Sequence, residues 1–222
     1  MGGSVGIGAL IVGVGLIGVF VIANSAINAQ MESSLEVIQS ADDPLPSISF
    51  VNENLDEDAI LDLRLNHLNK FVNQFVIAEA QFTHSGKKRN LLFDIKKFKK
   101  FENKITYLIL DHEPYDIEIV NNQDSEGEKS SKYILNGYKR DNYQRNYLTK
   151  GIKDAEPNDI IMISDIDEIP KLEEINFESI KNKLIFFQQK MFYYKFNLFY
   201  SDIPWYGSKA CKKKHFKSPQ WI

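Results

Sequence analysis

The sequence predicts an α/β fold: a mostly parallel sheet with flanking helices, preceded by an apolar helix. An uninterrupted apolar run opens the chain, and every charged side chain lies at or after Glu32. From Ser47 onward, β-like runs alternate with helical patterns, which is typical of a parallel sheet covered by helices. The 222 residues are enough to bury a sizeable core. We therefore expect an apolar helix over 1–31, a linker over 32–47 and one globular domain over 48–222.

Composition excludes several classes of protein. The 27 Lys and Arg residues against 30 Asp and Glu give a formal net charge of −3, so no basic nucleic-acid-binding face is expected. The single cysteine, Cys211, excludes an internal disulfide framework and a metal site built from several cysteines. The four histidines show no spacing typical of a metal site.

The amino-terminal apolar run predicts a membrane anchor. Val5–Ala23 contains 19 residues without a polar side chain, and a helix of that length spans about 28 Å, close to the thickness of a bilayer core. The absence of Lys and Arg before it favours an outside amino terminus, although the side of the membrane stays open. A signal segment, a pilin-like assembly helix and a buried core helix are the alternatives.

Two short motifs in this run lack the context that they need. Gly2–Gly6 matches G-x-S-x-G, but no strand precedes the serine. Gly13–Gly18 matches G-x-G-x-x-G, but the polar 32–47 segment follows where dinucleotide binding requires a helix and a second strand. A dinucleotide-dependent oxidoreductase is therefore a minor alternative.

The globular part reads as strands separated by helices. The β-like runs are Ile48–Val51, Phe75–Ala80, Lys104–Leu110, Asp159–Ile163, Leu184–Phe187 and Met191–Phe199. A first helix follows from the apolar stripe Leu61, Leu65, Leu68 and Val72, with Asn54 or Asp56 as its cap. A second helix is predicted over Tyr138–Lys150, after a polar loop over Asp116–Lys132. Ligands of such sheets bind beyond the carboxyl ends of the strands.

The strongest candidate site follows one of these strands. Four apolar residues, Ile160–Ile163, lead into Asp165, Asp167 and Glu168. In an extended chain Asp165 and Asp167 point the same way, and two carboxylates on one face repel each other unless a cation lies between them. Oxygen ligands of this kind suit Mn²⁺ or Mg²⁺, which also take phosphate oxygens. The alternative is an acidic surface turn.

Two basic segments are further candidates. Tyr138–Asn146 carries Arg140 and Arg145, two of only four arginines, and arginine suits bidentate phosphate contact. Thr83–Arg89 is a glycine-containing basic loop without the Walker A pattern. A solvated helix face and a solvated loop are the alternatives.

Several segments resemble glycosyltransferase family seventeen, the family of β-1,4-mannosyl-glycoprotein 4-β-N-acetylglucosaminyltransferases and their bacterial and viral relatives. The resemblance lies in Asn52–Asp58, Leu61–Asn66, Phe75–Glu79, Phe82–Gly86, Gln144–Asn146, Asp159–Pro170 and Lys217–Trp221, in the order of the family. It runs from about Phe50 to the end of the chain, so it is more specific than the paired acids alone.

The resemblance implies a GT-A-like, Rossmann-type fold and an inverting, metal-dependent transfer of N-acetylglucosamine from UDP-GlcNAc to a glycan acceptor. It implies that Asp165 and Asp167 hold Mn²⁺ or Mg²⁺ and that Asp165, Glu79, Arg145 and Asn146 lie at the donor. Inversion requires a carboxylate base, for which Glu168 and Asp167 are the candidates.

Two departures from the family pattern keep a second function open. The first strand is short and follows an unfamiliar amino-terminal segment, and further family sequence is expected after Ile222, so we expect an incomplete transferase domain. The alternative function is a membrane-tethered or pilin-like structural protein with an inactive transferase-like body.

Overall fold

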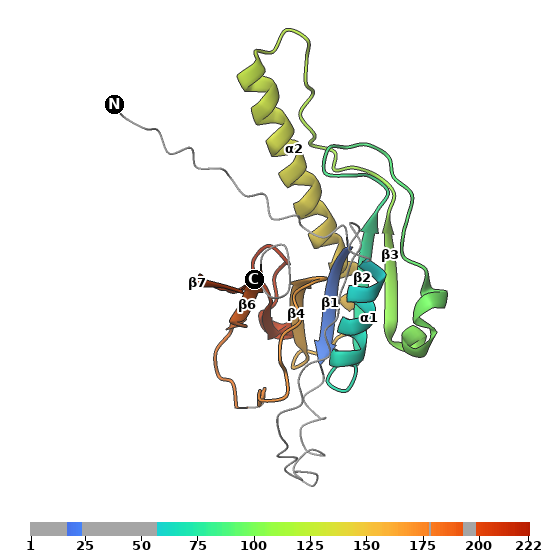
Figure 1. The fold of residues 1–222 in the computed structure, drawn as a ribbon, viewed down its shortest axis with the longest axis vertical. Helices are drawn as coiled ribbons and strands as arrows, with labels where there is room; N and C mark the ends of the chain where they lie inside the picture. Colours follow the sequence, from blue (N-terminus) through green and yellow to red (C-terminus); the bar gives the residue numbers. More distant parts are fainter. Residues whose placement is uncertain (1–16, 24–56, 178, 193–198) are drawn as a thin grey trace.

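A computed structural model describes residues 17–23, 57–177, 179–192 and 199–222 of the chain. Within these residues, the centre of the molecule is a six-stranded sheet in the order β3-β2-β1-β4-β8-β5 (Figure 1). Its strands are β1 (Ile17–Ala23), β2 (Gln74–Ala80), β3 (Ile105–Leu110), β4 (Ile160–Asp165), β5 (Ile185–Phe186) and β8 (Lys209–Lys212). A separate antiparallel pair consists of β6 (Gln189–Phe192) and β7 (Phe199–Trp205).

The described sheet is mixed, so the prediction of a mostly parallel sheet is wrong. Only β2 and β3 pair in parallel, and the other four strand pairs of this sheet are antiparallel. Because β1 runs antiparallel to both β2 and β4, those two strands and β3 all point in one direction. The carboxyl ends of β2, β3 and β4 therefore still meet at one edge, as the sequence predicted.

Strand β1 corrects the prediction of an apolar amino-terminal helix. Its seven residues belong to the predicted Val5–Ala23 helix but form a strand between β2 and β4, so the helix is wrong over β1. A short apolar run has no periodicity that separates a buried strand from a helix. The remainder of the predicted helix, and the predicted strand Ile48–Val51, lie outside the described residues.

None of the described helices is long and apolar enough to cross a membrane. Membrane attachment through the amino-terminal segment stays a prediction, and a helix over its full length would require β1 to leave the sheet.

Alternating side chains of the strands enter two cores, one on each face of the sheet. On β2, Phe75 and Ile77 pack in the core that includes helix α1 (Glu57–Leu68). Val76 and Ala78 pack on the opposite face with residues of η3 (Leu148–Ile152). This two-residue alternation places α1 and η3 on opposite sides of the sheet.

Helix α2 (Glu126–Tyr147) begins much earlier than predicted and continues into η3. A capping box starts it: the Ser125 hydroxyl accepts from the Glu128 amide, and the Glu128 carboxylate accepts from the Ser125 amide. The polar loop predicted over Asp116–Lys132 is therefore wrong from Glu126 onward. The amino-terminal half of α2 projects beyond the carboxyl ends of the strands (Figure 1).

The other predicted elements are mostly found within a few residues. The runs Phe75–Ala80 and Lys104–Leu110 form β2 and β3, and the strand predicted from Asp159 forms β4 and extends to Asp165. Two short 3₁₀ segments, η2 (Ile95–Lys104) and η4 (Lys213–His215), complete the described elements.

Candidate active site

The acidic segment predicted as a metal site forms a tight turn at the carboxyl end of β4. Residues Ile160–Ser164 are buried, and the Glu168 amide then donates to the Asp165 carbonyl at 3.2 Å. Because the strand ends at Asp165, the two-residue alternation does not extend to Asp167, whose side chain is exposed. The structure thus places the three acids together, in a turn rather than along a strand.

Arg145 contacts the first acid of this turn. Its Nη2 donates to Asp165 Oδ1 at 2.7 Å, and its Nε lies 3.7 Å from Asp141 Oδ2. Burial raises the pKa of the Asp165 carboxyl to about 6, Arg145 lowers it, and the carboxylates of Glu168, Asp167 and Asp141 raise it further. The turn therefore concentrates negative charge that a cation would stabilise.

Glu168 is held on both of its carboxylate oxygens. Oε2 accepts from the Asp165 amide at 3.0 Å, and Oε1 accepts from the Trp205 indole Nε1 at 2.8 Å. The side chain is 9% exposed. A Cβ at Gly207 would lie 1.5 Å from Glu168 Oε1, so only glycine allows this approach. These contacts fix the turn to the end of β7.

A buried arginine that the sequence analysis did not assign to the site lies beneath the turn. Arg64 of α1 is 0% exposed, and its Nη1 donates to the carbonyls of Asp165 at 2.9 Å and Glu168 at 2.5 Å. One signal was present in the sequence. Arg64 lies next to Leu65 and three residues after Leu61, on the apolar stripe of its helix, where a charged residue is costly without partners.

The last turns of α2 run across the carboxyl ends of the strands. Gln144 Nε2 donates to the Ala78 carbonyl of β2 at 3.2 Å, and the Tyr143 hydroxyl lies 2.8 Å from His112 Nε2, just after β3. Asn146 is exposed on the same helix end. The structure therefore places the end of the predicted Tyr138–Asn146 segment at the carboxyl ends of the strands, where its Arg145 contacts the acidic turn.

His112 is itself placed by a carboxylate. Its Nδ1 lies 2.7 Å from Asp111 Oδ1, and this hydrogen bond is the main cause that lowers the pKa of the Asp111 carboxyl. The line from Asp111 through His112 to Tyr143 therefore ties α2 to the end of β3.

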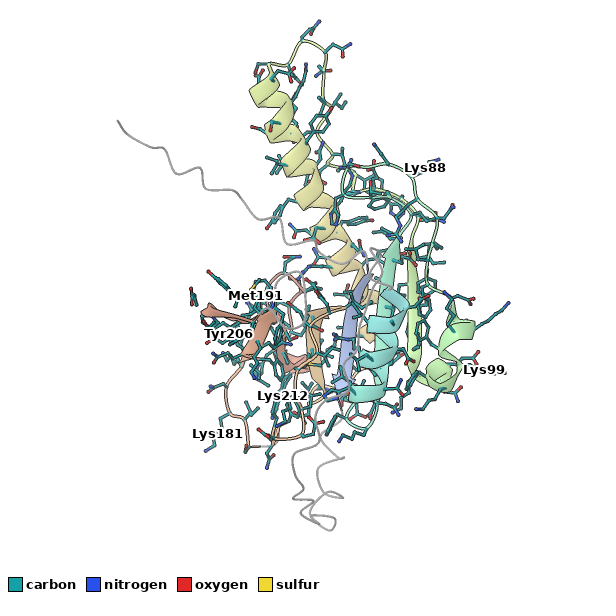
Figure 2. The ribbon with its side chains drawn as sticks, viewed as in Figure 1. Lys88, Lys99, Lys181, Met191, Tyr206 and Lys212 are labelled. Atoms are coloured by element: carbon teal, nitrogen blue, oxygen red, sulfur yellow. The ribbon has the colours of Figure 1, made fainter. Side chains whose placement is uncertain are left out.

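The basic loop after β2 is fixed to the same helix. Arg140 donates from Nε to Glu113 Oε1 at 2.5 Å and from Nη1 to the His84 carbonyl at 2.9 Å. Gly86 has a φ of +79°, and a Cβ there would lie 2.4 Å from the Arg140 guanidinium. Both the backbone conformation and the lack of space therefore require glycine at this position. Figure 2 shows Lys88 of this loop at the same end of the sheet as α2, with Lys99 at the opposite end.

Glu79 lies at the end of β2, but its side chain is completely buried. Its carboxylate pairs with Arg89 and accepts from the amides of Leu92 and Phe93 at 2.7 and 3.1 Å and from the Tyr107 hydroxyl at 2.7 Å. These partners lie in the segment after β2 and in β3. In this arrangement the Glu79 carboxylate cannot contact a ligand directly. Any effect of Glu79 on a ligand would act through the segment after β2 that its hydrogen bonds hold.

Among the residues that the structure describes, no group of three or more His, Cys, Asp and Glu side chains is arranged to hold a metal ion. The turn offers Asp165 and exposed Asp167, whose charges already interact. Two carboxylates suit Mn²⁺ or Mg²⁺ when water and phosphate oxygens supply the other ligands, so these residues fit the expected metal.

Acids at the end of β4, Arg145 on α2 and the loop after β2 together define an α/β protein with its candidate ligand site at the carboxyl ends of the strands. A family model of glycosyltransferase family 17 matches residues 46–218. The chain belongs to glycosyltransferase family 17, which confirms the resemblance seen in the sequence.

The curated relatives are much longer proteins. The β-1,4-mannosyl-glycoprotein 4-β-N-acetylglucosaminyltransferases of Homo sapiens, Rattus norvegicus and Mus musculus are each 30% identical over 142 residues. The match covers 60% of this chain and 24%, 23% and 23% of those relatives. The chain thus spans about a quarter of their length. No solved structure matches the chain significantly.

Proposed function

We propose that this chain transfers N-acetylglucosamine from UDP-GlcNAc to a glycan acceptor in a metal-dependent, inverting reaction. Family membership and the activity named for the curated relatives support the transferase class. The observation that carries the site is the acidic turn after β4, held by Arg64 and paired with Arg145.

Asp165 and Asp167 are the proposed ligands of Mn²⁺ or Mg²⁺. Burial is the main cause that raises the pKa of the Asp165 carboxyl, and repulsion from Glu168 and Asp167 adds to it; a divalent cation beside these acids would relieve that repulsion. The bound cation would supply neutralisation of the diphosphate as it leaves.

Arg145 and Asn146 are the proposed donor-binding residues. Arg145 is about one-quarter exposed and already at hydrogen-bond distance from Asp165, so a phosphate beside the turn lies within reach of its guanidinium. Glu79 contributes indirectly, because its hydrogen bonds hold the segment after β2.

Inversion requires a base that removes the proton of the acceptor hydroxyl during its attack on the anomeric carbon. Asp167 and Glu168 are the proposed candidates, and they differ in access. Asp167 is exposed, whereas both oxygens of Glu168 already accept hydrogen bonds. Glu168 is also largely buried, so its burial and these two hydrogen bonds favour a holding role for Glu168.

The decisive test is thermal unfolding of the full chain with UDP-GlcNAc, with Mn²⁺ and with both together. We expect both ligands together to raise the unfolding temperature, because a ligand that binds only the folded state adds about 2.7 kcal/mol at a hundredfold excess over its Kd. Asp167→Asn should abolish the shift. Asp154→Asn, which removes an exposed acid outside the turn, is the matched control and should retain it.

Release of UDP in the presence of an N-glycan core acceptor would then test transfer. A folded wild-type chain without any joint effect of Mn²⁺ and UDP-GlcNAc would contradict the proposed donor and metal.

A further inference from the structure

Arg64 is a buried charge whose position is explained by the acidic turn. It lies on the face of α1 that packs on the sheet, between the fully buried neighbours Leu61 and Leu65. Burial lowers the pKa of its guanidinium to about 10, and the carboxylates of the turn act in the opposite direction, so Arg64 is charged at neutral pH. A buried cation is costly unless it is hydrogen-bonded and compensated.

The hydrogen bonds of Arg64 go to main-chain carbonyls and a hydroxyl rather than to a carboxylate. Nη1 reaches the carbonyls of Asp165, Ile166 and Glu168 at 2.9, 3.5 and 2.5 Å, and Nη2 donates to the Ser164 hydroxyl. One guanidinium thus donates to the main chain of every residue of the Asp165–Glu168 turn except the exposed Asp167. The fixed fork of arginine matches several oxygens at once, which a lysine ammonium on a flexible stem does not.

The main chain of the turn and its acidic side chains thus have different partners. The carbonyl oxygens of Asp165, Ile166 and Glu168 accept from Arg64 inside the molecule. The Asp165 carboxylate pairs with Arg145, and Asp167 is exposed. The carboxylates of Glu168, Asp165 and Asp167 lie close enough to oppose the effect of burial on the Arg64 pKa.

We propose that Arg64 is a positioning residue that sets the geometry of the Asp165–Glu168 turn and thereby its affinity for the divalent cation and the rate of transfer. The inference rests on the proposed function. Arg64 touches no ligand itself and acts through the backbone of the turn.

The test compares two variants. Arg64→Met removes the positive charge and the planar guanidinium, whereas Arg64→Lys keeps a positive charge but loses the guanidinium. Binding of Mn²⁺ in the presence of UDP is measured from the electron paramagnetic resonance signal of free Mn²⁺, and kcat is measured against Mn²⁺ concentration. We expect Arg64→Met to weaken Mn²⁺ binding about tenfold and to lower kcat about a hundredfold, because small misplacements of reacting groups have effects of that size. Arg64→Lys should be intermediate.

Leu65→Ala is the matched control, because Leu65 is a fully buried neighbour of Arg64 on α1 whose apolar side chain donates no hydrogen bond to the turn. Its cavity should destabilise the fold by about 2–5 kcal/mol. A loss of folded protein lowers the apparent kcat but leaves the Mn²⁺ midpoint unchanged, so this variant separates stability from positioning.

The outcomes distinguish the two proposals. Wild-type Mn²⁺ binding and kcat in folded Arg64→Met would overturn the role of Arg64 and leave the proposed function intact. Absence of Mn²⁺-dependent UDP binding in the wild-type chain would instead contradict the proposed function. If Arg64→Met fails to fold, the Arg64→Lys variant provides the test. A wild-type Mn²⁺ midpoint and a wild-type kcat in Arg64→Lys would overturn the inference.

Discussion

Two arginines reach the acidic turn from different helices, and the sequence indicated only one of them as a site residue. Arg145 was predicted near the donor because of its residue type and family motif, and it pairs with Asp165. Arg64 contacts residues about one hundred positions away in the chain, and no local pattern specifies a partner at that distance. Its location on an apolar stripe is the local sign that such a partner exists.

At this scale, the raised pKa of Asp165 predicts an unusual pH dependence of stability. Burial raises this pKa from 3.8 to about 6, so the folded state holds the proton more tightly than the unfolded chain does. The contribution of Asp165 to the free energy of unfolding is therefore present below pH 4 and is lost as the pH rises through about 6, by about 3 kcal/mol in total.

Urea unfolding of the metal-free wild type and of Asp165→Asn, at pH 4, 5, 6 and 7, measures this contribution. We expect the wild type to lose stability relative to Asp165→Asn across that range. Asp154→Asn should run parallel to the wild type. A difference between wild type and Asp165→Asn that does not change with pH would refute the assigned burial of this carboxyl.

The elements that pack on the sheet were predicted better than those that leave it. The β2 strand was visible as an apolar run, because burial on both faces leaves a nearly continuous apolar sequence. The β3 run was also predicted, although this strand lies at the edge of the sheet and is mostly half-buried. The first half of α2 was missed, because its exposed polar residues resemble a loop in composition. The Ser125-x-x-Glu128 capping pattern was the available signal, since it satisfies amides that only a helix leaves unpaired.

The capping box therefore predicts a local effect on α2. Ser125→Ala removes the side-chain acceptor for the Glu128 amide and should destabilise the first turn by about 1 kcal/mol. Hydrogen exchange should become several-fold faster over residues 126–131, with little change over 140–147. Ser130→Ala, an exposed serine within the same helix, should leave exchange nearly unchanged. Equal exchange in wild type and Ser125→Ala would show that the cap does not stabilise the helix.

For the whole molecule, the sequence analysis did not predict that β1 lies in the sheet and runs antiparallel to both of its neighbours. The order of strands and helices predicted a parallel sheet, and the three strands that form the site edge do run together. The strand between two of them comes from the apolar segment that hydropathy assigned to a membrane helix. Hydropathy measures how apolar a segment is, and a central strand and a membrane helix share that property.

A proline substitution within β1 tests whether this segment is a central strand of the sheet or part of a membrane helix. Val21 pairs with Phe75 of β2 and Met162 of β4, and Val21→Pro removes a main-chain donor from the middle of the sheet. We expect a loss of about 2 kcal/mol or more in the free energy of unfolding, together with weaker donor binding. Val21→Ala keeps the main-chain amide and controls for the lost side chain. Equal unfolding free energies of the two variants would argue against a central β1.

The position of β1 also has a consequence for synthesis on the ribosome. Its partner β4 begins at Ile160, so this uncharged strand is translated long before the strand that covers one of its two edges. Pairing between strands that lie far apart in the sequence slows folding. Before β4 is translated, the apolar β1 strand has an unpaired edge and is prone to associate with other chains. Chaperone dependence during translation is therefore expected to concentrate in the interval between β1 and β4.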